Sequence, residues 1–231
     1  MDIKLFYQEK GAGEPFLFLH GNGEDSSYFR HQIEYFSDRY RVMALDTRGH
    51  GKSPRGGAPF TIQQFSCDLY EFMREHGISR AVLLGFSDGA NIAMRFAMAH
   101  PEMVRALILN GGNLDAKGVK RATQLPIEIG YRIASHFAEK SPDVKKNAEL
   151  LGLMVNDPNI RPEELAKITA PTLVICGSRD MIKEFHTREI ADNIPGAKLV
   201  ILKGNHFIAN KRPAEFNRAV DEFLEETGQG R

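Results

Sequence analysis

Tryptophan is absent from this sequence, cysteine occurs only twice, and neither sign of charge dominates. Thirty Lys and Arg residues balance thirty Asp and Glu residues, so no overall field would attract nucleic acid or an anionic membrane surface. No stretch approaches the roughly 18 apolar residues of a membrane span, and the first residues lack the basic and apolar regions of a signal peptide. We therefore expect a cytoplasmic protein that acts on a small molecule, with no nucleic-acid or membrane partner.

The scarcity of cysteine also argues against a disulfide scaffold or a cysteine-rich metal site. Cys67 and Cys176 lack metal-ligand spacing and fall in an expected helix and an expected strand. We expect both to be buried core residues, and we expect no cofactor and no metal. The 231 residues, 42% hydrophobic and 26% charged, have an ordinary globular composition that suffices for one full core.

The most informative stretch is residues 81–89, A-V-L-L-G-F-S-D-G, which a helical pattern follows at 90–99. This pattern predicts a buried strand, a sharp turn with Ser87 at its apex, and a helix. A strand that reverses directly into a helix strains the apex, and the flanking Gly85 and Gly89 give the chain room to pass. G-x-S-x-G is the pattern of a nucleophile elbow, but by itself it also fits an ordinary strand-to-helix turn.

Other short apolar runs indicate further strands. The segment 3–7 predicts a short edge strand, and buried strands are expected at 16–19, 41–45, 106–109, 171–177 and 198–202. Helical patterns at 28–36, 61–73, 187–193 and 213–225 lie between or after them, and Thr61 with Gln64 can form a capping box. Strands that alternate with helices over short connections predict an α/β fold, with a parallel sheet covered by helices on both faces.

The pattern changes between residues 113 and 169. Charged and apolar residues mix there at helical spacing, and four prolines are expected to break the segment into short helices: Pro126, Pro142, Pro158 and Pro162. We therefore predict a core domain formed by residues 1–112 and 170–231, and a small helical cap, 113–169, inserted over one end of the sheet.

Two further polar residues follow strands in the way that Ser87 does. A serine hydroxyl needs a general base and a third group that orients the base. His206 follows the last strand, and Asp180 follows the strand before it, so all three residues lie at carboxyl ends of strands in the order Ser, Asp, His. We predict a catalytic triad of Ser87, Asp180 and His206.

The other seven histidines fit structural roles better. His20 and His50 adjoin glycines in loops, and the rest lie in or beside helical segments, where a solvated or capping role is expected: His31, His76, His100, His136 and His186. The oxyanion that forms when Ser87 attacks a carbonyl needs two backbone donors. We expect them to be the N–H groups of Asp88, at the start of the helix, and of Asn22, in the glycine loop after 16–19.

Taken together, these motifs resemble the α/β-hydrolase family over essentially the whole chain. The resemblance rests on the His20-Gly21 loop, the D-T-R-G-H-G-K-S loop at 46–53, and Ser87, Asp180 and His206 in that order. It implies a mostly parallel twisted sheet of eight strands, with an antiparallel strand near the start and a helical cap after the sixth. It also implies that the 46–53 loop is a structural turn, so that Ser53 is not a rival nucleophile.

Three features depart from the family pattern. Only one strand is expected before Gly11, so the sheet has seven strands if its first edge is missing. The cap is small, which favours an open site. Asp88 follows the nucleophile directly, and its carboxylate either pairs with a cationic group of the substrate or forms a salt bridge with a nearby arginine, the second interpretation being favoured.

The leading hypothesis is a serine hydrolase that cleaves carboxylic esters, thioesters or lactones of small molecules through an acyl-enzyme. The resemblance also allows C–C bond hydrolysis or cofactor-free perhydrolysis with the same triad, and a non-catalytic receptor that binds a small molecule. For the substrate pocket we expect apolar contributions from Ile127, Tyr131, Met154 and Phe207. The sequence leaves the oligomeric state open between monomer and homodimer.

Overall fold

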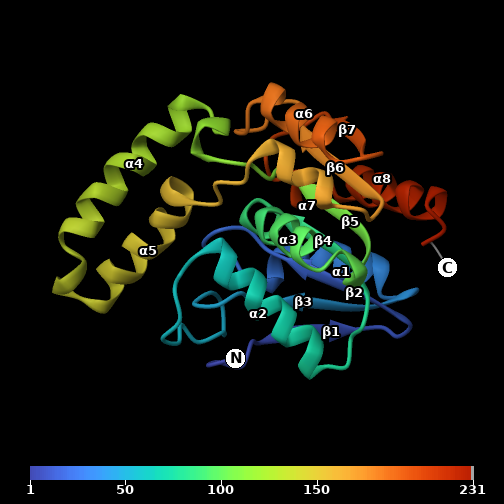
Figure 1. Cartoon of the computed structure of the whole chain (residues 1–231), viewed down its shortest axis with the longest axis horizontal. Coiled ribbons are helices and arrows are strands. Elements are labelled where there is room, and N and C mark those ends of the chain that lie inside the picture. Colours follow the sequence, from blue (N-terminus) through green and yellow to red (C-terminus); the bar gives the residue numbers. More distant parts are fainter. Residues whose placement is uncertain (230–231) are drawn as a thin grey trace.

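The computed structural model describes residues 1–229 and contains one seven-stranded sheet (Figure 1). Its strands lie in the order β1-β3-β2-β4-β5-β6-β7, and only β1 runs antiparallel to its neighbour. The strands are β1 Tyr7–Lys10, β2 Glu14–Leu19, β3 Tyr40–Leu45, β4 Ala81–Phe86, β5 Val104–Asn110, β6 Thr172–Gly177 and β7 Lys198–Leu202. This sheet confirms the predicted α/β fold, with the seven strands expected if the first edge of the family's sheet is missing.

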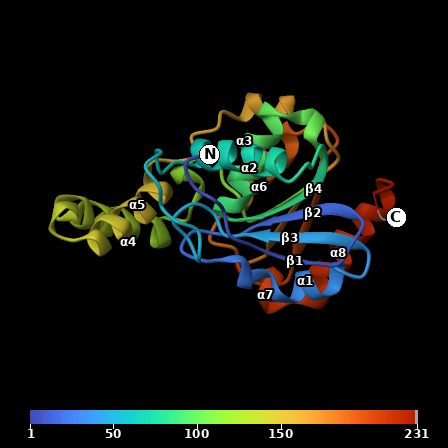
Figure 2. The same cartoon turned by 90° about the horizontal axis from the view of Figure 1, so that it is seen from below.

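Helices cover both faces of the sheet (Figure 2). One face carries α2 Ile62–Glu75, α3 Asp88–Ala99 and α6 Glu184–Asn193, and the other carries α1 Arg30–Phe36, α7 Ile208–Lys211 and α8 Pro213–Glu226. Side chains alternate along each strand, so Leu17 and Leu19 belong to the core beneath α2 and α3, while Phe16 and Phe18 belong to the core on the opposite face. A strand buried on both faces must be apolar at every position, which explains the continuous apolar runs.

The first strand lies later in the chain than predicted. The segment expected to be a strand was 3–7, but β1 pairs with β3 through residues 7–10. Leu5 is buried in the core against α2 and α3, and this burial produced the apolar signal. The chain before β1 is held instead by loop contacts, because the Phe6 N–H donates to Ser53 Oγ at 2.8 Å and the Phe6 carbonyl accepts from the Asp46 N–H at 2.9 Å.

The segment between β5 and β6 contains two longer helices, α4 Arg121–His136 and α5 Pro142–Asn156. They pack against each other as a hairpin that extends away from the sheet (Figure 1). Short 3-10 helices lie at Ala116–Gly118, Ala138–Lys140 and Pro162–Lys167, with two more at Ser26–Phe29 and Pro101–Met103. None of the helices in residues 1–229 is long and apolar enough to cross a membrane.

Pro126 does not break its helix, contrary to expectation. It lies inside the 16-residue α4. A proline there leaves the carbonyl four residues earlier, that of Ala122, without its helical partner. Both residues are exposed, so water can satisfy this carbonyl, and the helix continues. Pro142 and Pro162 do begin helices, and Pro158 follows the end of α5, so the other three prolines lie at boundaries as predicted.

Helix α2 is capped at Thr61 as predicted, but two details of its side chains differ from the prediction. Thr61 Oγ1 accepts a hydrogen bond from the Gln64 N–H at 3.1 Å, as a capping residue does, but the Gln64 side chain donates to Asp68 at 3.0 Å, so only half of the capping box forms. Cys67 is exposed on this helix, and the expectation that it is buried is wrong, because the helix turns Phe65 and other apolar residues inward instead. Cys176 in β6 is buried as expected.

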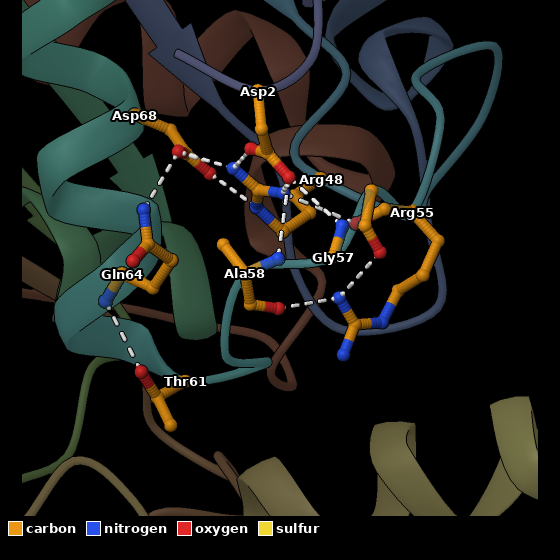
Figure 3. Close-up of polar contacts among 9 residues, drawn as sticks. Asp2, Arg48, Arg55, Gly57, Ala58, Thr61, Gln64 and Asp68 are labelled. Atoms are coloured by element: carbon orange, nitrogen blue, oxygen red, sulfur yellow. Dashed lines mark hydrogen bonds and ion pairs between the residues drawn. The ribbon is translucent and has the colours of Figure 1, made fainter.

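A buried arginine ties the loop after β3 to α2 and to the N-terminus (Figure 3). The Arg48 guanidinium is completely buried and donates to both carboxylate oxygens of Asp68, at 2.7 and 2.6 Å. It also donates to Asp2, which accepts hydrogen bonds from the backbone N–H groups of Gly57 and Ala58 as well. Arg48 thereby orients the 46–58 loop, and the pKa of Asp2 is held well below its usual range by this guanidinium.

Replacement of Asp68 should test how much this buried pair contributes to stability. We expect Asp68→Ala to lower the free energy of unfolding by about 3 kcal/mol, because it leaves the buried Arg48 charge with only the peripheral Asp2 carboxylate. Glu184→Ala is the control, since it breaks an exposed ion pair with Arg188 and should change stability by less than about 1 kcal/mol. Urea denaturation measures both, and equal small losses would contradict the proposed role of Arg48.

Candidate active site

The turn between β4 and α3 holds Ser87 in a strained backbone conformation. Its φ is 54° and its ψ is −118°, outside the regions that non-glycine residues favour. Backbone bonds fix it there: the Ser87 N–H donates to the Asn110 carbonyl at 2.8 Å, and the Ser87 carbonyl accepts from Ala90 at 2.9 Å. A Cβ on Gly85 would collide with the Gly89 backbone, and one on Gly89 with the Leu19 carbonyl, so both glycines are required by the predicted close approach.

Asp180 and His206 meet at the carboxyl ends of β6 and β7. His206 Nδ1 donates to Asp180 Oδ1 at 2.7 Å, and both side chains are buried. The same Asp180 oxygen accepts from the Ile182 N–H at 2.9 Å, which holds the carboxylate in place. His206 Nε2 is buried and has no hydrogen-bond partner in the described part of the chain, and neither has Asp180 Oδ2. The imidazole is therefore oriented through Nδ1 and keeps Nε2 available.

Ser87 and His206 line one small cavity of about 70 Å³. The residues around it come from the loop after β2, from β4 and its turn, from α5, and from the loops after β6 and β7: Gly21, Asn22, Glu24, Phe86, Ser87, Met154, Met181, His206 and Phe207. No hydrogen bond joins Ser87 Oγ to His206 within residues 1–229, and such bonds are often loose before substrate binds. The structure therefore brings the three predicted residues to one place.

His20 orients the glycine loop that faces Ser87. Its Nδ1 bonds the Gly21 carbonyl at 2.7 Å, and its Nε2 accepts from the Thr47 N–H at 3.0 Å, which assigns a neutral ring with the proton on Nδ1. Burial lowers the pKa of His20, consistent with this neutral form. Among residues 1–229, the Asn22 and Asp88 N–H groups donate none of the loop hydrogen bonds. Both predicted oxyanion donors are thus available beside Ser87.

The Asn22 side chain has a role that the sequence did not reveal. Its Nδ2 donates to Asp88 Oδ2 at 2.9 Å and to the Leu150 carbonyl of α5 at 2.8 Å. One amide therefore links the glycine loop to the nucleophile turn and to the inserted helices. Residues 128 positions apart in the chain meet here, so only the tertiary structure could show this contact.

Asp88 forms no salt bridge with an arginine in the described structure, and the favoured interpretation of its side chain is wrong. Its buried carboxylate accepts instead from the amides of Asn22 and of Asn91, at 2.9 and 3.3 Å. Burial raises the pKa of Asp88 to about 6, and the charge of Asp157 adds to this rise, while the two amides and His206 oppose it. A neutral amide satisfies a buried carboxylate without bringing a second buried charge.

The predicted pocket residues divide into two groups. Met154 and Phe207 line the cavity with Ser87, but Ile127 and Tyr131 do not. Tyr131 lines a separate cavity of about 360 Å³ between α4 and α5, and its hydroxyl accepts from Asn156 at 3.0 Å. The α4–α5 hairpin extends away from the sheet (Figure 1), and no residue of α4 is among those that line the cavity with Ser87. Glu24 and Met181 also line the cavity, and no sequence signal singled them out, although both directly follow predicted site loops.

Ser53 has a structural role. It donates to the Asp46 carbonyl at 2.7 Å and accepts from the Phe6 N–H, which confirms that it is engaged within its turn.

A larger cavity of about 510 Å³ lies between the 49–60 loop and α5, and Ser87 is not among its lining residues. Arg55 and Glu149, which form an ion pair, both line it. His186 is buried and accepts from the Leu114 N–H at 2.9 Å, so its role is structural as expected, but it is neither solvated nor a helix cap. In residues 1–229, no three His, Cys, Asp or Glu side chains are grouped as metal ligands would be.

Comparison with known proteins agrees with this fold. The α/β-hydrolase fold family model matches residues 14–127. The chain is 26% identical to 3-oxoadipate enol-lactonase 2 of Acinetobacter baylyi, over 96% of this chain and 94% of that protein. It is 25% identical to the human serine hydrolase BPHL, over 96% of this chain and 84% of that protein.

A solved structure extends the likeness to three dimensions. The enol-lactonase from Burkholderia xenovorans LB400 superposes with a TM-score of 0.81 at 25% identity, over 96% of this chain and 97% of that chain. These matches, with the sheet described above, show that the chain has the α/β-hydrolase fold. It is a hydrolase, as the sequence predicted.

The raised pKa of Asp88 predicts how stability depends on pH. A carboxyl group whose pKa is higher in the folded state than its unfolded value, near 4, stabilises the fold fully below that unfolded value. This contribution is lost as the pH rises through about 6. Asp88→Asn removes the titration, so its free energy of unfolding relative to the natural protein should increase by roughly 2 kcal/mol between pH 4 and pH 8. Urea denaturation across this range measures the difference, and a pH-independent difference would contradict the assignment.

Proposed function

We propose that the protein is a serine hydrolase that cleaves carboxylic esters, including thioesters and lactones, of small molecules through an acyl-enzyme. The observation that carries this proposal is the His206–Asp180 hydrogen bond beside Ser87, together with the second imidazole nitrogen, which has no partner among residues 1–229. A histidine held through Nδ1 and open at Nε2 is arranged to remove a proton from a neighbouring hydroxyl.

In the proposed reaction, Ser87 Oγ attacks the carbonyl carbon of the ester while His206 Nε2 accepts the hydroxyl proton. His206 then delivers this proton to the departing alcohol, and the acyl group stays bound to Ser87. Asp180 keeps the ring in the required tautomer and stabilises the imidazolium that forms. Water enters with His206 as general base, attacks the acyl carbon and releases the acid and a free serine.

The oxyanion formed in both steps would be stabilised by the backbone N–H groups of Asn22 and Asp88. The Asp88 N–H lies at the start of α3, where the helix dipole favours a negative charge. Loss of one such donor typically costs about 3 kcal/mol of transition-state stabilisation. The name of the Acinetobacter baylyi relative supports an ester-type substrate, because that protein is an enol-lactonase and a lactone is a cyclic ester.

Covalent labelling separates the enzyme from a receptor of the same fold. A fluorophosphonate probe should label the protein stoichiometrically at Ser87, because only an activated serine attacks phosphorus at a useful rate. Intact-protein mass spectrometry should show one adduct, and Ser87→Ala should show none. Ser53→Ala serves as the comparison and should still be labelled. Absence of labelling in the natural protein would refute the proposed activity.

The roles of Asp180 and His206 predict large losses of turnover. Asp180→Asn and His206→Ala should each lower kcat for a p-nitrophenyl ester by several orders of magnitude, since a misoriented or missing base cannot take the serine proton. The matched controls are Asp192→Asn and His136→Ala, which change exposed residues of the same types outside the cavity. Near-normal turnover of Asp180→Asn would mean that another residue orients the base.

A further inference from the structure

Glu24 lines the cavity that contains Ser87 and His206. It follows the glycine loop directly, and its backbone N–H donates to the Gly21 carbonyl at 3.2 Å. Its Oε2 is buried and has no hydrogen-bond partner among residues 1–229. A buried carboxyl oxygen without a partner is costly, so its presence calls for a physical explanation.

The described part of the chain offers no cation to this carboxyl group. None of the ion pairs found in residues 1–229 includes Glu24. Burial raises the pKa of Glu24 to about 7, with a smaller contribution from Asp25, while the Gly21 backbone and His206 oppose the rise. The nearby Tyr28 hydroxyl is also buried and unpartnered in the described structure. Glu24 thus differs from Asp88, whose carboxylate is satisfied by two amides.

The lining of the cavity limits what can approach Glu24. Glu24 and Ser87 line the same cavity of about 70 Å³, so a group bound next to Ser87 also lies near Glu24. Phe86, Met154, Met181 and Phe207 supply the apolar side chains of the wall, and Glu24 is the only carboxylic acid among the lining residues.

We propose that Glu24 is a specificity-determining residue that accepts a hydrogen bond from an N–H or O–H group of the substrate close to the reacting carbonyl. This inference rests on the proposed ester hydrolysis at Ser87. The preferred substrates are then esters that carry an ammonium or hydroxyl group near the carbonyl, on the acyl or the alcohol side. Such a donor satisfies Oε2, and an ammonium group also stabilises the ionised carboxylate.

Isosteric substrates test this proposal directly. Phenyl esters of glycine, glycolic acid and propionic acid place an ammonium, a hydroxyl or a methyl group at the same position of the acyl chain. Butyrate esters of ethylene glycol and of propanol make the hydroxyl-to-methyl comparison on the alcohol side. For each ester, kcat/KM is measured at pH 7 for the natural protein, for Glu24→Gln, and for Asp25→Asn as the control. Asp25 neighbours Glu24 and carries the same charge, but its side chain caps the helical turn at Ser27, a role that asparagine also performs.

We expect the natural protein to favour a donor-bearing ester over its methyl isostere. Glu24→Gln should lower kcat/KM for the preferred ester about 10- to 100-fold if the donor is ammonium, and several-fold if it is hydroxyl, because the amide oxygen still accepts but carries no charge. It should leave the methyl isostere nearly unchanged, which also shows that the variant is folded. Asp25→Asn should leave all these ratios unchanged.

The outcomes distinguish this inference from the function on which it rests. If Glu24→Gln changes all esters by the same factor, or if no donor-bearing ester is preferred on either side, Glu24 is not a specificity residue. That result would leave hydrolysis by Ser87 intact. If the natural protein hydrolyses none of the esters and takes no fluorophosphonate label, the proposed function itself fails.

Discussion

The reversal of the chain at Ser87 is the constraint on which the rest of the site depends. β4 lies within the sheet, between β2 and β5, and the chain leaves it directly into α3, so Ser87 must adopt a φ of 54°. Such a backbone persists only where the surroundings hold it, and here the Asn110 carbonyl and the close approach of two glycines do so. The same turn presents Ser87 and the Asp88 N–H together at the carboxyl edge of the sheet.

The polar groups around this turn are buried, and each one needs a partner. His20 bonds two backbone groups, and Asp88 accepts from two amides, so both are satisfied without a second charge. Asn22 joins this network to the Leu150 carbonyl and so connects the inserted helices with the nucleophile turn. Among the buried polar atoms without a partner in residues 1–229 are His206 Nε2 and Glu24 Oε2, both of residues that line the cavity. A bound substrate would supply the contacts that these two atoms lack.

Sequence patterns predicted best those features that arise from local chemistry. Continuous apolar runs located the strands β2 to β7, although β7, expected to be buried, lies at the edge of the sheet and is only partly buried. The positions of Asp180 and His206 after two of these strands indicated that they would meet. Where local rules competed with tertiary contacts, prediction failed. Leu5 produced a strand signal because it packs in the core, Cys67 lies on the solvent side of an amphipathic helix, and Pro126 is tolerated because the carbonyl that it frees faces water.

The sequence by itself determined the α/β fold, the strand-turn-helix at Ser87, and which three residues would converge. These follow from periodicity and from the rule that parallel strands end at one edge of a sheet. Only the tertiary structure decided what surrounds them: that Asp88 is satisfied by Asn22 and not by an arginine, that α4 stands away from the cavity, and that Glu24 faces it. The physical reason is that burial and hydrogen-bond partnership belong to pairs of residues far apart in the chain, and no local pattern specifies which pairs will meet.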